Sequence, residues 1–374
     1  MKAVGLLRTD ILGMEPYTPI VPFDVLSARL GRPPEDIVKL DANENPYGPP
    51  PGALRAVSGA SYYHIYPDPE ANALREAISR YTQIPKESIL AGMGADELID
   101  LVLRAVIEPE DAVIDCPPSF GMYPFSTAVN AGRYVPVPRR ADFSLDLSAI
   151  EAAISDRPRA KVLFVCSPNN PDGSVISDDL LTRLLALPLL VVLDEAYIDF
   201  AEADGFPSRI SWVAQHDNLA VLRTFSKLAG LAGLRVGYGV FPSWLMPHLW
   251  KIKQPYNINV AASSAAIAAL EDVDWLREKV DLLVMERNRI ARELAQFDFL
   301  EPYPSHSNFV LFKVIGRSAA DLKRFLEVEG VLVRYFNKPG LSNCIRVSAG
   351  RPVDTDRLLA ALRKISDQRG GTND

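Results

Sequence analysis

The sequence predicts an α/β fold, with a large domain built on a mostly parallel sheet flanked by helices and a smaller α+β domain. Two observations predict it. Between about residues 70 and 245, helical patterns alternate with short apolar strands, which is typical of βαβ units and a buried parallel sheet. After Pro255 the pattern changes to a long alanine-rich helical region followed by separated strands. With 374 residues, the chain is long enough for both domains.

The same change of pattern predicts the domain boundaries. We expect residues 37–255 to form the larger domain. Residues 1–36 and 256–374 are expected to form an N-terminal segment together with the small C-terminal domain. The first of these segments is proline-rich and irregular, with a helical pattern around Phe23–Leu30.

The predicted elements follow one another in a regular order. Helical patterns in the first part of the chain cover Ala71–Tyr81, Ala95–Val106, Leu147–Ile154 and Leu180–Leu187. Short apolar runs predict strands at Ser88–Ala91, Ala112–Asp115, Arg133–Pro136, Lys161–Cys166, Leu189–Leu193, Asn218–Arg223 and Val236–Val240. The second part has a helical region from about Ala261 to Phe297 and strands at Phe309–Val314, Val331–Arg334 and Cys344–Ser348, with helices between them.

Composition and charge exclude several classes of partner. A net charge of −7 argues against a nucleic-acid or anionic-membrane surface, so an anion must be bound by a few locally placed groups. The longest apolar run, Leu184–Leu193, contains Pro188 and is too short to span a bilayer. Charged residues interrupt the N-terminus, so no signal peptide is predicted. We expect neither a nucleic-acid nor a membrane partner.

The cysteines and histidines predict neither disulfides nor a metal site. Cys116, Cys166 and Cys344 are far apart, no CxxC motif occurs, and the four histidines are scattered. We therefore expect no metal and a reducing, cytoplasmic setting.

Five of the predicted strands are followed by segments rich in glycine or polar residues. In doubly wound sheets, ligands bind at the carboxyl ends of the strands, so these segments are the candidate site. In chain order they read GMGADE from Gly92, PPSFGMY from Pro117, SPNNPDG from Ser167, DEAY from Asp194 and TFSKLAGLAGLR from Thr224.

Taken singly, each segment has an ordinary structural explanation. GMGADE is either an anion-binding helix start or a plain strand-to-helix turn, and it lacks the third glycine of a dinucleotide fingerprint. Phe120 is either a stacking surface or a core aromatic. Asp194 is costly to bury unpaired, but it could cap a helix, and Lys227 could be a solvated charge.

Together the five segments describe one ligand. They supply an anion cradle, a flat aromatic, an amide, a buried carboxylate with a tyrosine, and a lysine followed by an arginine. Pyridoxal 5′-phosphate is a phosphorylated, cationic, planar aldehyde, and it would use every one of these groups. Its aldehyde needs a lysine, its pyridinium nitrogen a carboxylate, and its phosphate a set of hydrogen-bond donors.

The motifs also carry a resemblance to a known family. The five segments occur in order with DANENPYGPP (Asp41–Pro50), YPD (Tyr66–Asp68), SNF (Ser307–Phe309), GVLVRYF (Gly330–Phe336) and CIRVSAG (Cys344–Gly350). This set resembles the fold-type-I pyridoxal-phosphate aminotransferases, which have the aspartate-aminotransferase-like fold. Within them the chain is most similar to the histidinol-phosphate aminotransferases. The matches span nearly the whole chain and specify the fold and cofactor more strongly than the substrate.

The resemblance implies a role for each cofactor-binding residue. Lys227 would bond to the cofactor aldehyde and, once displaced by substrate, move a proton between the substrate Cα and the cofactor. Asp194 would pair with the pyridinium nitrogen. The other implied contacts are Tyr197 and Asn170 with the 3′-oxygen, Phe120 stacked on the ring, and Ala95, Asp96, Thr224, Ser226 and Arg235 with the phosphate.

The resemblance further implies substrate contacts and a partner subunit. Arg346 would bind the carboxylate of the amino-acid substrate as a bidentate pair. Arg334, Asn45 and Tyr17 are candidates for the remaining contacts, including a substrate phosphate. Tyr66 would reach the cofactor phosphate of the other subunit, which implies a homodimer with shared sites.

The implied activity is transamination between glutamate/2-oxoglutarate and histidinol phosphate/imidazole-acetol phosphate, in histidine biosynthesis. Two residues depart from the family pattern: Asp172 stands at a usual threonine, and Met93 at a usual asparagine, but neither position supplies a required cofactor group. An aromatic amino-acid aminotransferase and a threonine-phosphate decarboxylase share the scaffold and stay open. A non-catalytic cofactor-binding regulator is disfavoured because Lys227, Asp194 and Tyr197 are intact.

Overall fold

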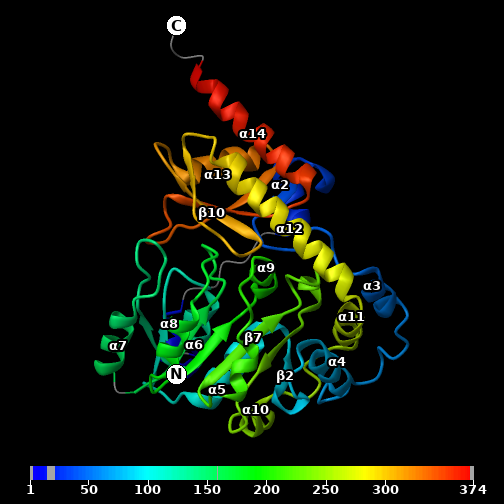
Figure 1. Ribbon diagram of the computed structural model, residues 1–374, viewed down its shortest axis with the longest axis vertical. Helices are drawn as coiled ribbons and strands as arrows, with labels where there is room; N and C mark the ends of the chain where they lie inside the picture. Colours follow the sequence, from blue (N-terminus) through cyan, green and yellow to red (C-terminus); the bar gives the residue numbers. More distant parts are fainter. Residues whose placement is uncertain (1–2, 15–21, 158, 371–374) are drawn as a thin grey trace.

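Two sheets organise the chain in the computed structural model, which describes residues 3–14, 22–157 and 159–370 (Figure 1). The larger sheet has seven strands in the order β2-β8-β7-β6-β5-β3-β4. They are β2 (Ile89–Gly92), β3 (Ala112–Asp115), β4 (Arg133–Pro136), β5 (Ala160–Cys166), β6 (Leu190–Asp194), β7 (Leu219–Thr224) and β8 (Gly237–Val240).

The larger sheet is mostly parallel, which confirms the predicted fold class. Strands β7, β6, β5, β3 and β4 pair in parallel, whereas β8 runs antiparallel to both of its neighbours. The parallel strands therefore all end at the same edge of the sheet. Cys166 pairs with Asp194, and Asp194 with Leu222, so the ends of β5, β6 and β7 lie side by side.

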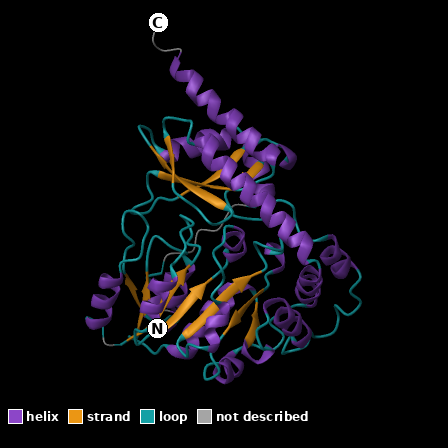
Figure 2. Ribbon diagram, viewed as in Figure 1, coloured by secondary structure: helices purple, strands orange, loops and turns teal. Residues whose placement is uncertain are grey.

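Helices cover both faces of this sheet, as Figure 2 shows. Alternate residues of β5 enter two different cores: Leu163 and Val165 pack on one face, and Val162 and Phe164 on the other. This burial on both faces explains the continuous apolar runs that predicted the strands. The helices of this part are α3 (Pro51–Ser58), α4 (Asn72–Thr82), α5 (Gly94–Val106), α6 (Met122–Val129), α7 (Leu147–Ser155), α8 (Asp178–Leu185), α9 (Ile198–Ala203), α10 (Met246–Ile252) and α11 (Val260–Glu271).

A second sheet of five strands, in the order β1-β11-β12-β10-β9, packs with the C-terminal helices. Its strands are β1 (Val38–Leu40), β9 (Leu300–Pro302), β10 (Phe309–Val314), β11 (Val331–Tyr335) and β12 (Cys344–Ser348), and its helices include α13 (Ala319–Val328) and α14 (Pro352–Gly370). Strand β1 follows directly on residue 37, the predicted start of the larger domain, and it pairs in parallel with β11.

The predicted helical region from Ala261 to Phe297 is two helices, α11 and α12 (Val273–Leu294), which meet at Asp272. The Asp272 carboxylate accepts a hydrogen bond from the backbone N–H of Trp275 at 3.4 Å, so it caps the start of α12. The remaining helices are α1 (Thr9–Leu12), α2 (Phe23–Leu30) and the short 3₁₀ turns η1 (Ala3–Leu6), η2 (Pro34–Asp36), η3 (Lys86–Ser88), η4 (Ile210–Ala214) and η5 (Ala232–Leu234). Within the described ranges, no helix is long and apolar enough to cross a membrane.

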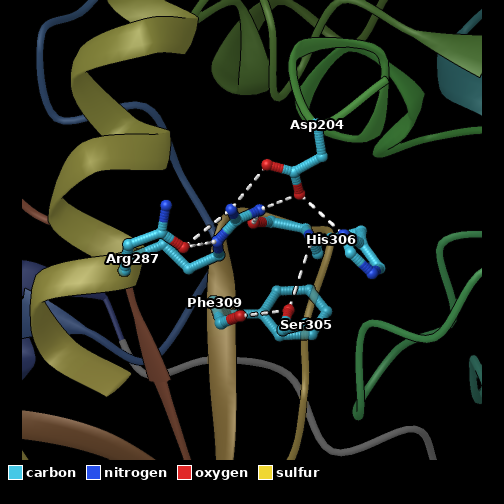
Figure 3. A network of polar contacts seen from close by, with 7 residues as sticks. Asp204, Arg287, Ser305, His306 and Phe309 are labelled. Carbon is cyan, nitrogen blue, oxygen red and sulfur yellow. Dashed lines mark hydrogen bonds and ion pairs between the residues drawn. The ribbon is translucent and has the colours of Figure 1, made fainter. Parts of the chain in front are cut away.

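A polar network connects the two parts of the molecule (Figure 3). Arg287 of α12 donates two hydrogen bonds of 2.9 Å to Asp204, which follows α9 in the larger part. His306, which precedes β10 in the smaller part, lies with Nδ1 2.7 Å from the same carboxylate. Although burial raises the pKa of Asp204, its bonds with Arg287 and His306 outweigh this and hold it below the ordinary value. The paired charges fix α12 against the larger part.

Candidate functional site

Two adjoining cavities lie at the carboxyl edge of the larger sheet. The first measures about 370 Å³ and the second about 330 Å³. Ala42, Phe120, Tyr197 and Lys227 line both of them. Lys227 follows β7 and therefore stands between the two spaces, where one amine can reach ligands in either.

Lys227 has the environment of a reactive amine. Its Nζ donates a hydrogen bond to the backbone oxygen of Ala42 at 3.2 Å and lies 5.8 Å from the centre of the Tyr197 ring. Loss of hydration inside the protein lowers its pKa to about 8, and the nearby charge of Arg346 acts in the same direction. A useful fraction of the amine is thus neutral near pH 7–8, as a nucleophile or base requires.

Asp194, the last residue of β6, is a buried carboxylate in the wall of the first cavity. It is 2% exposed and accepts hydrogen bonds from the hydroxyl of Tyr123 at 2.7 Å and the N–H of Ala196 at 3.0 Å. Both donors are neutral, and no cation of the described chain lies within ion-pair distance of it. Burial raises the pKa of Asp194 to about 6. A cationic ring nitrogen in the cavity would supply the missing partner.

The opposite end of the first cavity is built to hold an anion. Helix α5 begins here, and its first backbone N–H groups lack helical partners. Arg235 donates to the carboxylate of Asp96 at 2.9 Å, which neutralises the acid beside this helix start. Gly94 has φ +75°, a backbone conformation that favours glycine, and a Cβ there would also displace the guanidinium of Arg235, which it would meet at 2.7 Å. Ala95, Asp96, Thr224, Ser226 and Arg235 all line this end.

Tyr197 and Asn170 link the two cavities. The Tyr197 hydroxyl accepts hydrogen bonds from the side-chain amides of Asn43 at 3.1 Å and Asn170 at 3.3 Å. Burial raises the pKa of Tyr197 to about 12, so its own proton stays available for donation. The amide oxygen of Asn170 accepts a hydrogen bond from Arg346 at 2.6 Å. A chain of hydrogen bonds thus connects Arg346 in the second cavity with Tyr197 in the wall that both cavities share.

Arg346 places a cation in the wall of the second cavity. It lies in β12, paired in register with Arg334 of β11, and both arginines line the cavity. The guanidinium donates to the backbone oxygen of Asp41 at 2.8 Å and lies 5.1 Å from the ring centre of Phe309. Such a planar, oriented fork suits a carboxylate or phosphate.

The structure places three of the predicted residues outside these cavities or leaves them undescribed. Asn45 lines neither cavity, and its side-chain amide instead donates a hydrogen bond to the backbone oxygen of Leu228 at 3.0 Å. Tyr66 is 81% exposed and stacks on Tyr256 at 4.8 Å. Tyr17 lies outside the described residues. The other predicted residues come together at the two cavities.

Sequence reasoning missed three side chains at this edge. Tyr123 holds Asp194, Asn43 holds Tyr197, and Asp115 lines the second cavity. Tyr123 lies inside the PPSFGMY segment, and Asp115 is the last residue of a predicted strand, so position alone could have indicated both. Asn43 gave no such indication, because its contact with Tyr197 spans 154 residues.

The first cavity fits pyridoxal 5′-phosphate on chemical grounds. It combines an unpaired buried carboxylate, an anion-binding helix start with an arginine, and an amine of lowered pKa. Phe120 supplies the flat ring at its wall and meets Tyr123 edge-on at 5.6 Å. Among the residues described, no group of three or more His, Cys, Asp or Glu side chains is placed to hold a metal ion.

Comparisons with known proteins agree with this chemistry. The model of the family "Aminotransferase class I and II" matches residues 35–362. A histidinol-phosphate aminotransferase of tobacco chloroplasts (Nicotiana tabacum) is 51% identical over 96% of this chain and 86% of its own length. That of Roseiflexus castenholzii is 48% identical over 97% of this chain and 98% of its own length.

A solved structure agrees as well. The histidinol-phosphate aminotransferase of Sinorhizobium meliloti, in complex with pyridoxal-5′-phosphate, superposes with a TM-score of 0.87 at 31% identity. The match covers 97% of this chain and 98% of that one. Fold, site and sequence thus agree: the chain belongs to the aminotransferase class I and II family.

Proposed function

We propose that the chain is a pyridoxal-phosphate-dependent aminotransferase of histidine biosynthesis. Glutamate and 2-oxoglutarate are interconverted in one half-reaction, and histidinol phosphate and imidazole-acetol phosphate in the other, so that the amino group passes between the two pairs by way of the cofactor. One observation carries the proposal: Lys227 stands between a cavity that suits the cofactor and a cavity walled by Arg334 and Arg346 that suits an anionic substrate. The names of the relatives from Nicotiana tabacum, Roseiflexus castenholzii and Sinorhizobium meliloti support the choice of substrate.

The protein residues divide the chemistry among them. When bound, pyridoxal 5′-phosphate supplies an aldehyde that accepts the amino group and a ring that withdraws electrons from the substrate Cα. Asp194 keeps the ring nitrogen protonated, because a carboxylate buried among neutral donors favours a cation beside it. Lys227 takes the proton from the substrate Cα and holds it for return. The Tyr197 hydroxyl, in the wall that both cavities share, would donate a hydrogen bond to the 3′-oxygen of the cofactor.

The second cavity holds the substrates. The guanidinium of Arg346 binds the carboxylate of glutamate in the plane of its fork, with Asn170 fixing its direction. Arg334 and Lys338 line the same cavity and add positive charge for the phosphate of histidinol phosphate. One cavity can therefore accept two substrates that share an amine and an anion but differ in the remaining group.

The proposal includes a homodimer with shared sites. Tyr66 belongs to a run of exposed aromatic and aliphatic residues, with Tyr62, Tyr63 and Ile65, and such a patch favours a protein partner. Light scattering should give twice the mass of the chain. Mixed dimers of Lys227→Ala and Tyr66→Ala subunits should recover activity that neither variant has, because one site then keeps both residues. A monomeric, active protein would contradict this arrangement.

We also propose a cytoplasmic location. The three cysteines are free and buried, as a reducing compartment allows.

The direct test of function is a panel of substrates. The holoenzyme is mixed with glutamate, histidinol phosphate, phenylalanine or threonine phosphate, and the cofactor absorbance reports each reaction. We expect glutamate and histidinol phosphate to react fastest. Faster conversion of phenylalanine would assign an aromatic aminotransferase, and release of carbon dioxide from threonine phosphate would assign a decarboxylase.

A further inference from the structure

Asp115 is a buried carboxylate that the mechanism above does not use. It is the last residue of β3, is 2% exposed and lines the second cavity. Its Oδ2 accepts a hydrogen bond from the hydroxyl of Tyr134 in β4 at 3.0 Å. Its Oδ1 has no hydrogen-bond partner within the described residues. An unmade hydrogen bond at a buried, charged oxygen is costly, so the oxygen requires explanation.

The cations near Asp115 do not pair with it. Arg139 donates instead to the backbone oxygens of Cys116 at 3.1 Å and Phe143 at 2.9 Å. Lys338 is exposed on the cavity wall, and no ion pair of the described chain includes Asp115. Burial raises the pKa of Asp115 to about 6, against the opposing effects of Tyr134, the Cys116 backbone, Arg139 and Lys338.

The opposite end of the same strand shows how this sheet treats a carboxylate that serves only the fold. Asp111 directly precedes β3 and is 1% exposed. It forms ion pairs with Arg159 at 2.8 Å and Lys161 at 2.6 Å. Although burial opposes the shift, hydrogen bonds from Lys161, the Glu108 backbone and Arg159 lower the pKa of Asp111 to about 2. Asp115 lacks such partners, and it faces the cavity rather than a basic side chain.

Asp115 and Lys227 both line the second cavity, but they follow strands that are not neighbours in the sheet. The strand order β3-β5-β6-β7 separates their strand ends by three spacings, or about 14 Å at the usual distance between strands. The side chain of Lys227 spans part of this distance. The remainder suits a small ligand whose amine lies at Lys227 and whose far end lies at Asp115, with its anion on the Arg334 side.

We propose that Asp115 determines specificity by accepting, at Oδ1, a hydrogen bond from the N–H of the substrate's imidazole ring. This assignment rests on the proposed function, in which one substrate carries imidazole. The ring titrates near pH 6.5 and presents an N–H donor in both charge states, whereas a phenyl ring of the same shape presents none. Tyr134 holds Oδ2, so Oδ1 is the oxygen left for the ligand, and a rotation of the carboxylate brings it from its buried position to the cavity wall when the ring binds. A phenyl ring would leave the oxygen unpaired, which is how a polar site rejects an apolar analogue.

The test compares two ligands that differ only in the ring. Histidinol phosphate and 2-amino-3-phenylpropyl phosphate are titrated by calorimetry into the holoenzyme in its amino form, in which neither amine can react. We expect the wild type to prefer the imidazole ligand by about 10- to 100-fold. The double variant Asp115→Leu/Tyr134→Phe removes both members of the pair without leaving a buried group unpaired. It should lose about tenfold or more of this preference.

Two controls separate the assignment from a structural role. Tyr134→Phe alone keeps the Asp115 carboxylate and should keep most of the preference. The glutamate half-reaction of the double variant should lose much less than the ring preference does, because glutamate carries no ring to bond with Oδ1. An unchanged ring preference in the double variant, or an equal loss in the glutamate half-reaction, overturns the role of Asp115. If the wild type does not convert histidinol phosphate at all, it is the proposed function that fails.

Discussion

The two edges of the seven-stranded sheet treat buried charge in opposite ways. At the amino edge, Asp111 is paired with Arg159 and Lys161. At the carboxyl edge, Asp194 is buried with neutral donors alone, and Lys227 forms no ion pair in the described part of the chain. The strands are the same at both edges, so the difference is not one of fold. Asp111, which serves the fold, has charged partners in the chain, whereas Asp194 and Lys227 at the site form no ion pair among the described residues.

The contrast also holds between neighbours in sequence. Asp194 faces the first cavity, whereas the next residue, Glu195, is equally buried and pairs with Arg223 at 3.1 Å. Glu195 also accepts hydrogen bonds from the hydroxyl of Ser208 at 2.6 Å and the N–H of Arg209 at 2.8 Å. Glu195 therefore stabilises the loop that follows β6, whereas Asp194 stays open to the first cavity.

The largest expected effect comes from removing the site amine. Lys227→Ala should lower turnover by at least ~10³-fold, because no other amine stands between the cavities in the described chain. Steady-state assays with glutamate measure it. Lys161→Ala, at the other edge, should keep normal turnover despite some loss of stability. Comparable losses in both variants would erase the distinction between the edges.

Asp194→Asn should separate activity from stability. We expect turnover to fall ~10²-fold, because the ring nitrogen loses its anionic partner. The cofactor-free protein should behave differently. Asp194 has a pKa of about 6 against an ordinary 3.8, so its contribution is favourable at low pH and is lost as pH rises through 6.

Asparagine at position 194 carries no charge at any pH, so the variant does not lose stability as the pH rises through 6. Cofactor-free Asp194→Asn should therefore exceed the wild type in unfolding free energy at pH 8, by up to ~3 kcal/mol, and this gain should shrink toward pH 5. Urea unfolding at both pH values measures it. A variant less stable than the wild type at pH 8 would show that the carboxylate serves the fold.

The polar network of Asp204, Arg287 and His306, drawn in Figure 3, should contribute to stability as the paired charges at the amino edge do. Asp204→Asn leaves the buried guanidinium of Arg287 without its charge partner and should lower the free energy of unfolding by ~2 kcal/mol. Thermal unfolding of the holoenzyme reports it. Asn288→Ala removes only the neutral acceptor of the same guanidinium and serves as the matched control. A loss no greater in the charge variant than in the control would contradict this role.

The smallest effect is expected at the amino edge itself. Asp111→Asn should lower the free energy of unfolding at pH 7 by ~1 kcal/mol, since its two partners are partly exposed and water screens them. Because the pKa of Asp111 is about 2, the wild-type advantage should persist above pH 4 and disappear only as pH falls toward 2. Urea unfolding of both proteins at several pH values between 2 and 7 would measure this difference in unfolding free energy. A stabilised variant would place Asp111 with the site charges instead.

Much of the architecture could be predicted because its causes are local. Apolar runs such as Leu190–Asp194 reflect burial on both faces of a parallel sheet, and the segments at their ends occupy the cavity edge for the same reason. The break at Asp272 was missed because its cap lies inside an otherwise continuous helical pattern. Strand β1 was missed because three residues carry too little pattern to distinguish a strand.

The residues of the site also divide into those that the local sequence predicts and those that it does not. Lys227 and Asp194 were predictable from their strand ends. The missing hydrogen bond at Asp115 was not, because it depends on where Tyr134, Arg139 and Lys338 lie in space. The arginine positions were predicted only through resemblance, since nothing local distinguishes Arg346 from other arginines in strands.

The pairing of β1 with β11 has a consequence in time. Val38 meets Val331, which the ribosome adds 293 residues later. At about 5–20 residues per second, β1 waits about 15–60 s for its parallel neighbour. The strands of the larger sheet are all made within that interval. Every residue that lines the first cavity is therefore synthesised before Arg334 and Arg346, so the wall that carries these two arginines is the last part of the site to be made.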